Sequence, residues 1–323
     1  MSTTAGFARS LESHERERCQ DPVIDSHLHG VDFLQESDGL VSLLDRMDAA
    51  NISHAVIFGL PVIKKWGSEE PDRPNYYLDD DARCYYYTGT DEILAGYFQA
   101  LSPVAGKRLA PMLCGFNHTD RNAVFQVERK LASSGMWKGI GELICRHDDL
   151  TSQTLDETSR MNHPALLPIY DLAGTRGLPV LIHQNSTSVG VHDRFEYLEE
   201  VREPLSGFPG TTFVWAHCGI SRRVVHKYYH VMLEEMLQDH PNLNVDLSWV
   251  VYDQTVCRGG VPKKAWLSLI EKYPERFLIG SDICGRFHLV GKCMARYDRL
   301  LDMLSAGTRQ SVSSLNARRI WNF

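Results

Sequence analysis

The sequence lacks long hydrophobic runs, closely paired cysteines and an excess of positive charge, and each absence excludes a class of protein. No apolar run approaches the roughly 20 residues that cross a bilayer, so we expect no membrane partner. Residues 1–20 lack the apolar segment of a secretory signal and are expected to form an exposed N-terminal arm. The formal net charge of −7 argues against a nucleic-acid partner, which would require a basic face.

The eight cysteines also exclude a disulfide framework, because they are scattered and no pair has CxxC spacing. In a chain of 323 residues this usage is typical of reduced, buried thiols in a cytoplasmic protein. The length fits either two domains or one large α/β barrel. There is no internal repeat and no low-complexity linker, so we expect one domain over residues 21–323.

What the sequence does contain is a regular alternation of short apolar segments and amphipathic segments. The apolar segments are rarely interrupted by polar residues, which is typical of parallel strands buried on both faces. The eight predicted strands are 23–29, 54–61, 108–117, 137–144, 178–185, 211–219, 243–249 and 276–282. Helical patterns fill most of the gaps, including 39–51, 120–134, 222–239 and 289–305. Eight such units predict a closed (β/α)8 TIM barrel.

Two polar stretches, 63–90 and 146–164, interrupt this alternation directly after predicted strands. Loops at that end of a barrel commonly surround the active site, so we interpret both stretches as loop insertions at the C-terminal face. Simple solvated loops are an equally good interpretation of either one. The clustered tyrosines of 63–90 fit an aromatic lid, the apolar underside of a packed insertion or a contact in a homodimer.

Histidines and carboxylates recur at the carboxyl ends of five predicted strands, where a barrel brings its strand ends together. The six residues are His27, His29, Glu142, His183, His217 and Asp282. Imidazole and carboxylate are ligands that suit zinc, manganese or iron. Taken singly, each residue has an ordinary explanation, such as a helix cap for Asp282. Burying all six without a shared partner would be costly, so the set predicts a centre of one or two divalent metal ions.

The ordered motifs DSHLH, IGE, IHQN, AHCG and IGSD resemble the amidohydrolase superfamily. The chain is most similar to the amidohydrolase-related (amidohydrolase 2) branch, which also contains aminocarboxymuconate-semialdehyde-type decarboxylases. The resemblance implies that His27, His29 and Asp282 bind the more buried metal. It implies that His183 and His217 bind a second metal, or that one of them contacts the substrate. Zinc is the first candidate for these ligands, with manganese or iron as alternatives.

Glu142 occupies the strand-four position, where some members of the superfamily have a carboxylated lysine that bridges two metals. A glutamate in the family's IGE context favours a binuclear centre and hydrolysis over decarboxylation. In this interpretation a metal-bound hydroxide attacks an amide, ester, thioester or lactone carbonyl of a small substrate. Asp282 transfers the proton, a second metal or His217 polarises the carbonyl oxygen, and Glu142 belongs to the same catalytic group.

Three other functions remain compatible with the same residues. A nonoxidative decarboxylase of an aromatic or unsaturated acid would use one metal. A lactonase would use the side chains without metal, and a binding protein would hold a ligand without converting it. Release of carbon dioxide without incorporation of solvent oxygen would identify the decarboxylase.

Residues that follow the strands closely are expected to line the mouth and contact a carboxylated or aromatic substrate. They are His118, Arg146, Asn185, Trp249, Tyr252, Arg286 and His288. Arg146 or Arg286 suits a carboxylate through forked hydrogen bonds. Each also fits an ordinary surface salt bridge.

Overall fold

Eight parallel strands form a barrel in the computed structural model, which describes residues 21–61, 89–148, 158–191 and 193–323. The strands are β1 (Val23–His29), β2 (Ile52–Phe58), β3 (Leu109–Leu113), β4 (Gly139–Ile144), β5 (Val180–His183), β6 (Phe213–Trp215), β7 (Leu243–Asp246) and β10 (Phe277–Leu278). Each overlaps one of the eight segments expected from the sequence. The predicted (β/α)8 TIM barrel is confirmed. Nearly all of the 63–90 insertion and residues 149–157 of the second insertion lie outside the described residues.

The strands pair in chain order, from β1 to β7 and then β10. Closure depends on the short β10 and the residues that follow it. The backbone N–H of Ser26 donates to Ile279 O at 2.9 Å, and that of Asp282 donates to His27 O at 2.8 Å. The last strand therefore meets the first beside the predicted metal ligands.

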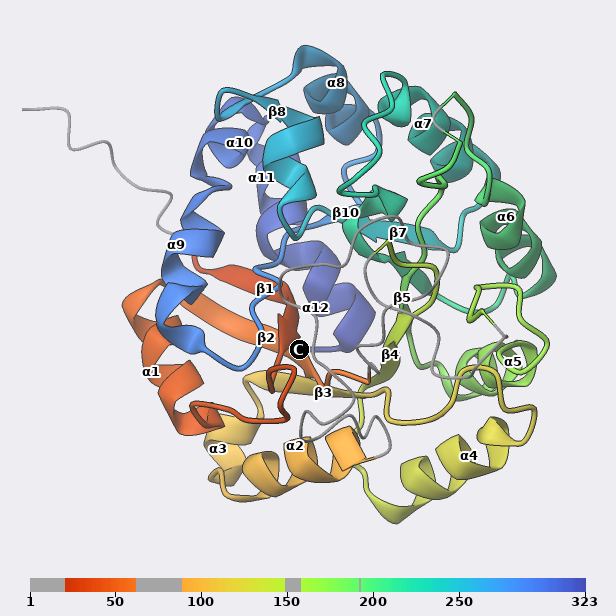
Figure 1. Ribbon diagram of the computed structural model, residues 1–323. Coiled ribbons are helices and arrows are strands. Elements are labelled where there is room, and N and C mark those ends of the chain that lie inside the picture. The colour runs from red at the N-terminus through yellow and green to blue at the C-terminus, as the bar shows by residue number, and fades with distance from the viewer. Residues whose placement is uncertain (1–20, 62–88, 149–157, 192) are drawn as a thin grey trace, which may run out of the picture.

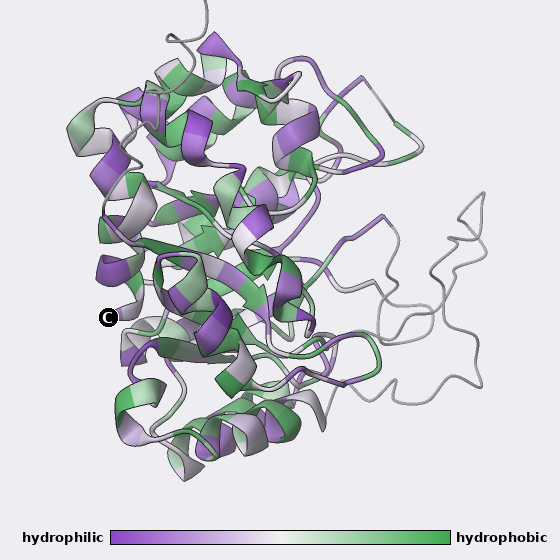
Figure 2. Ribbon diagram, turned by 90° about the vertical axis from the view of Figure 1, so that its left-hand side faces the viewer, coloured by the Kyte–Doolittle hydropathy of each residue, from purple (hydrophilic) through white to green (hydrophobic). Residues whose placement is uncertain are grey.

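Alternate residues of each strand face the barrel interior and the surrounding helices, as the period of two requires. In β2, Val56 and Phe58 belong to the inner cluster, whereas Ala55 and Ile57 pack outward. Helix α12 joins the inner cluster through Ala317, Ile320 and Trp321. Figure 1 shows the strands in the middle of the molecule with helices around them, and Figure 2 shows hydrophobic residues on the strands and both hydrophobic and hydrophilic residues on the helices.

Helices connect the strands and cover their outer faces. They are α1 (Leu40–Ala49), α2 (Thr90–Gln99), α3 (Pro103–Gly106), α4 (Ala123–Ser133), α5 (Leu167–Arg176), α6 (Leu198–Gly207), α7 (Tyr229–Asp239), α8 (Lys264–Lys272), α9 (Val290–Ala295), α10 (Asp298–Met303), α11 (Ala306–Gln310) and α12 (Asn316–Trp321). A small antiparallel pair, β8 (Cys257–Arg258) with β9 (Val261–Pro262), was not expected from the sequence. Within the described residues, no helix is both long enough and apolar enough to cross a membrane.

Two predicted helices are shorter than expected. The helix predicted from residue 222 begins at Tyr229, because the Ser221 hydroxyl accepts the backbone N–H groups of Arg223 and Val224 and holds the chain in a turn. The helix predicted over 289–305 is divided into α9 and α10 near Tyr297. The Tyr297 hydroxyl lies 2.8 Å from the carbonyl oxygens of both Leu247 and Gly280, which anchors this break to the barrel.

Candidate metal centre

Strand β1 places His27 and His29 on the same face, as expected for residues two apart in a strand. Both side chains are buried. The Asp25 carboxylate accepts the N–H of Ser281 at 2.8 Å and that of His27 at 3.2 Å, which ties β1 to the end of the barrel. At Gly280 an added Cβ would lie 2.6 Å from the His27 Cβ, so only glycine allows this close approach.

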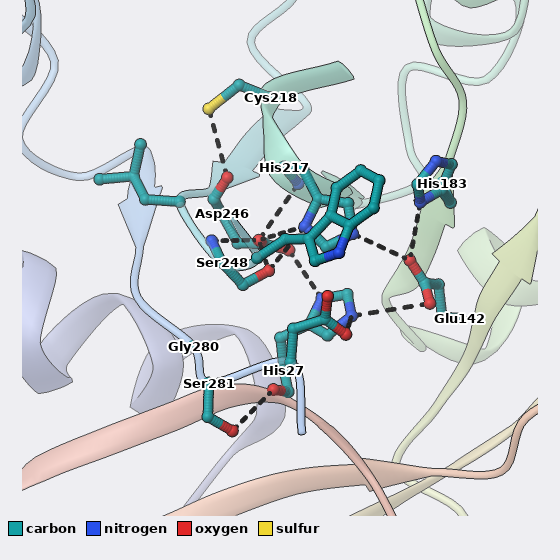
Figure 3. A network of polar contacts seen from close by, with 12 residues as sticks. His27, Glu142, His183, His217, Cys218, Asp246, Ser248, Gly280 and Ser281 are labelled. Carbon is teal, nitrogen blue, oxygen red and sulfur yellow. Dashed lines mark hydrogen bonds and ion pairs between the residues drawn. The ribbon is translucent and has the colours of Figure 1, made fainter. Parts of the chain in front are cut away.

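Glu142, from β4, lies between two groups of histidines and presents one oxygen to each. Its Oε2 is 3.6 Å from His27 Nε2 and 3.4 Å from His29 Nε2. Its Oε1 is 3.4 Å from His183 Nδ1 and 3.6 Å from His217 Nε2. Figure 3 shows the carboxylate with His183 on one side and His27 on the other. Asp282 completes the first group, with Oδ1 3.4 Å from His27 Nε2 and 3.3 Å from His29 Nε2.

These separations are longer than good hydrogen bonds, but they match the distance between two ligand atoms that bind the same cation. Zinc–nitrogen and zinc–oxygen bonds are about 2.0–2.2 Å long, so two ligands of a tetrahedral ion lie roughly 3.3–3.6 Å apart. Among the described residues, His27 Nε2 and Glu142 Oε1 are buried and have no hydrogen-bond partner. Buried polar atoms normally have one, and a cation would satisfy both of these.

Asp246, at the end of β7, orients one histidine of each group. His27 Nδ1 donates to Asp246 Oδ2 at 3.0 Å. Ser248 Oγ contacts Asp246 Oδ1 closely and lies 2.8 Å from His217 Nδ1. Both histidines therefore use Nδ1 for the protein and direct Nε2 toward Glu142, which is how carboxylates commonly support metal-binding histidines. Figure 3 shows this network.

Left-handed backbone conformations, which are uncommon outside glycine, occur in this region at His217, Trp249 and Asp282 as well as at Cys218. The φ angles are 54° at His217, 69° at Trp249 and 54° at Asp282. Such conformations cost free energy and occur mostly where surrounding structure enforces them, notably at functional sites. The barrel thus bears backbone strain to place these three side chains.

A cavity of about 220 Å³ opens onto the two ligand groups. Five predicted ligands line it: His29, Glu142, His183, His217 and Asp282. Phe33, Leu60 and Ile144 form an apolar part of the wall. His147, Arg222, Trp249 and Cys284 contribute the rest. A substrate in this cavity would lie directly against the ligand atoms.

Electrostatics keep the carboxylates of the centre ionised. Burial alone would raise the pKa of Asp282, but its contacts with His27 and His29 outweigh burial and hold that pKa below its ordinary value. Burial would lower the pKa of His29, yet the neighbouring Asp282 and Glu142 raise it to about 9. A proton and a metal ion therefore compete for the same imidazole nitrogens.

Comparisons with known proteins agree with this geometry. A family model described as amidohydrolase matches residues 128–323, which is more than half of the chain. The chain belongs to the amidohydrolase family. A comparison with curated proteins finds no match.

Solved structures with the same fold are distant in sequence. An uncharacterised TIM-barrel protein from Bordetella bronchiseptica is 12% identical, with 93% of this chain and 98% of that chain covered and a TM-score of 0.61. The 5-carboxyvanillate decarboxylase from Sphingomonas paucimobilis is 16% identical, with coverage of 94% and 99% and a TM-score of 0.55. A zinc-bound amidohydrolase from Burkholderia multivorans is 15% identical, with coverage of 94% and 99% and a TM-score of 0.54. At these identities the likeness establishes the fold alone.

The donor set of this amidohydrolase is suited to divalent metal. His27, His29 and Asp282 offer two imidazoles and a carboxylate on one side of Glu142, and His183 and His217 offer two imidazoles on the other. In each of two groups of three residues, the potential ligand atoms lie within 4.8 Å of one another, and Glu142 belongs to both groups. The described residues thus fit either one or two cations.

The residues predicted to contact substrate lie in several different places. Trp249 lines the cavity, and its ring centroid is 5.1 Å from that of His217. Asn185 lies beside the centre, where its Oδ1 is 3.3 Å from His183 Nε2 and its amide donates to Asp148 at 2.8 Å. It therefore orients His183, in the same way that Asp246 orients His27.

The other five predicted contact residues do not line the cavity. Arg146 makes two 2.7 Å hydrogen bonds to Glu200. Arg286 is exposed and pairs with three carboxylates: Asp32, Glu36 and Asp38. His118 and Tyr252 are buried away from the cavity, and His288 is exposed.

Sequence reasoning missed Asp246 and Arg222. Asp246 lies in the middle of the predicted strand 243–249, and only the structure shows that β7 ends at this residue, as a predicted strand does at Asp282. Arg222 was assigned to a predicted helix, and no sequence pattern showed that this helix begins seven residues later.

Proposed function

We propose that this chain is a binuclear metal-dependent hydrolase that cleaves an amide, ester, thioester or lactone bond of a small substrate. The observation that carries the proposal is the position of Glu142, with one carboxylate oxygen toward His27 and His29 and the other toward His183 and His217. A carboxylate that serves one cation alone would not need both histidine groups around it.

In this proposal His27, His29 and Asp282 would hold one ion, His183 and His217 would hold the other, and Glu142 would serve both groups. Divalent ions in such a site would lower the pKa of coordinated water to about 7 and would polarise a carbonyl group. Zinc is the first candidate, with manganese or iron as alternatives.

Asp282 is the proton carrier of the proposed reaction. It is ionised, its side chain is 10% exposed, and it lines the cavity, so it is able to accept the proton of the attacking water. It then returns that proton to the leaving group. The ring of His217 is held by Ser248 and Asp246 through Nδ1, so its Nε2 would hold the second ion, whose charge would polarise the carbonyl group.

Metal analysis of purified protein tests the proposal. We expect about two equivalents in the wild type and one or fewer in Glu142→Ala. Lys138→Gln, at the other end of the barrel, is the matched control and should retain two equivalents.

A screen of esters, amides and lactones in ¹⁸O-labelled water provides the second test. Hydrolysis places solvent oxygen in the acid product, and chelation should abolish turnover that added zinc restores. One metal equivalent in both proteins, together with carbon dioxide release from an acid, would replace hydrolysis by decarboxylation.

A further inference from the structure

A cysteine lies in the cavity beside two of the predicted metal ligands. Of the described cysteines, only Cys284 lines that cavity, together with His29 and Asp282. One potential ligand atom from each of these three residues lies within 4.8 Å of the other two. His29 Nδ1 is 2.8 Å from Gly59 O, so Nε2 is the nitrogen that His29 presents to this group. The thiol therefore belongs to the same cluster of donor atoms as the imidazole and the carboxylate.

The backbone around Cys284 is held against β1. The His29 N–H donates to Ile283 O at 2.9 Å, and the Gly285 N–H donates to His29 O at 3.0 Å. Gly285 has a φ angle of 64°, and a Cβ there would lie 2.5 Å from Asp32 N, so only glycine fits directly after Cys284. The position of the thiol beside His29 is thus fixed by the closure of the barrel.

The Cys284 thiol also lacks the hydrogen bond that another buried thiol of the barrel makes. Cys218 Sγ donates to Asp246 O at 3.2 Å. Over the ranges that the structure describes, the Cys284 thiol makes no hydrogen bond. His27 Nε2, which is buried and 3.4 Å from Asp282 Oδ1, has none either. Two unsatisfied groups therefore adjoin one carboxylate, as a shared cation would require.

A sulfur ligand changes which cations a site favours. Imidazole and carboxylate suit zinc, manganese and iron, whereas a thiolate is a soft donor that favours zinc over manganese. Zinc–sulfur bonds are about 2.3 Å long and zinc–nitrogen bonds about 2.0–2.1 Å, so a tetrahedral ion holds two such ligand atoms roughly 3.5 Å apart. The donor atoms around Cys284 are close enough for one ion to bring them to this distance. The thiol proton would pass to solvent as the sulfur binds.

We propose that Cys284 is an additional ligand of the ion that His27, His29 and Asp282 would hold, and that its sulfur makes the centre select zinc over manganese. The inference rests on the metal centre of the proposed function and is independent of the reaction that the centre catalyses. The sequence pattern does not mark this ligand, because a single cysteine two residues after IGSD has no metal-binding spacing.

X-ray absorption at the zinc edge tests the inference without any measurement of turnover. Metal-free wild type, Cys284→Ser and Cys284→Ala are loaded with one and then two equivalents of zinc. Cys293→Ser is the matched control, because Cys293 is also a half-buried free cysteine and does not line the cavity. Metal content and melting temperature establish that each variant is folded and loaded.

We expect a sulfur atom at about 2.3 Å from zinc in the wild type and in Cys293→Ser. Both substitutions of Cys284 should leave only nitrogen and oxygen, at about 2.0–2.2 Å. Competition with a fluorescent chelator should show zinc affinity reduced at least about 10-fold in Cys284→Ser, since loss of a residue that only orients a ligand already costs about 10–100-fold. Manganese affinity should change by less than about threefold, because manganese gains little from sulfur.

Zinc-loaded wild type without a sulfur neighbour would overturn the inference, as would a sulfur neighbour that remains in both Cys284 variants. Equal losses of zinc and manganese affinity would overturn the selectivity. A Cys284-dependent sulfur neighbour in a protein that binds one ion or releases carbon dioxide would retain the thiolate ligand and overturn the binuclear hydrolase. Two equivalents of zinc and hydrolysis, with only nitrogen and oxygen around the metal, would retain the proposed function and overturn the sulfur ligand.

Discussion

The two ends of the barrel differ in chemistry more than in shape. The cavity at the carboxyl ends of the strands is about 220 Å³, whereas a cavity of about 580 Å³ lies at the opposite end. The larger one is formed by the α2–α3 connection, the starts of β3 and β4, and residues 321–323. Its described lining contains no histidine, cysteine or acidic residue. The small cavity is lined by five of the six predicted metal ligands.

The comparison teaches that buried polar groups, and not volume, mark the reactive end of this barrel. Pairing two parallel strands brings their carboxyl ends together, so side chains that follow different strands meet at one rim. At the other end the same packing brings together the apolar Leu109, Ala110 and Trp321. A cavity lined by such apolar residues needs no cation to be stable.

The largest difference between the two ends is expected when a predicted metal ligand is removed. His29→Ala should lower kcat/KM at least 1,000-fold, because it removes an imidazole that faces both Glu142 and Asp282. The measurement is turnover of any ester or amide that the wild type hydrolyses, together with metal content. Met136→Ala, in the larger cavity, is the control. Wild-type turnover by His29→Ala would remove the metal centre from the mechanism.

Loss of an orienting residue should have a smaller effect. Asp246→Asn should reduce metal affinity about 10–100-fold, because Asp246 orients both His27 and His217. Competition with a fluorescent zinc chelator measures this affinity. Asn244→Ala is the matched control. Asn244 lies on the same strand toward the other end of the barrel and makes hydrogen bonds with Phe213 and Arg319. It should reduce stability without changing metal affinity.

His118 provides a buried histidine near the reactive end that is not a ligand. Burial lowers its pKa from 6.5 to about 4 in the folded protein. As the pH falls, His118 is therefore protonated in the unfolded chain before it is protonated in the folded protein. The contribution of the neutral His118 ring to the free energy of unfolding is fully present above pH 6.5 and is lost as the pH falls toward 4. At pH 5 the loss is about 2 kcal/mol. Urea unfolding at pH 7 and pH 5 should show a smaller pH-dependent loss in His118→Asn than in the wild type. His288→Asn, which replaces an exposed histidine, should not differ from the wild type.

The smallest effects are expected in the larger cavity. Lys138→Gln and Ser134→Leu change its lining without touching a ligand. We expect kcat/KM and metal content within about twofold of the wild type, as is usual for surface changes distant from a site. A tenfold change in either quantity would show that the two ends are coupled.

The sequence was sufficient to predict the barrel and the meeting of its strand ends. Periodicity identifies buried strands, and the barrel topology then places His27, Glu142 and Asp282 at one rim without further information. Which charged side chains from distant segments pair with one another could not be predicted in the same way. Arg146 is not among the described residues that line the cavity at the metal centre, because Glu200 on α6, 54 residues away, binds it.

The hydrogen bonds around Asp246 also bear on how readily the proposed metal ions would be bound. They hold the rings of His27 and His217 through Nδ1, so Nε2 is the nitrogen that each ring offers to a ligand. Loading should therefore be a local event, with little ordering to be completed and no change in circular dichroism. A preorganised centre of this type lends itself to exchange of one metal for another, so cobalt substitution offers a spectroscopic view of the unaltered scaffold.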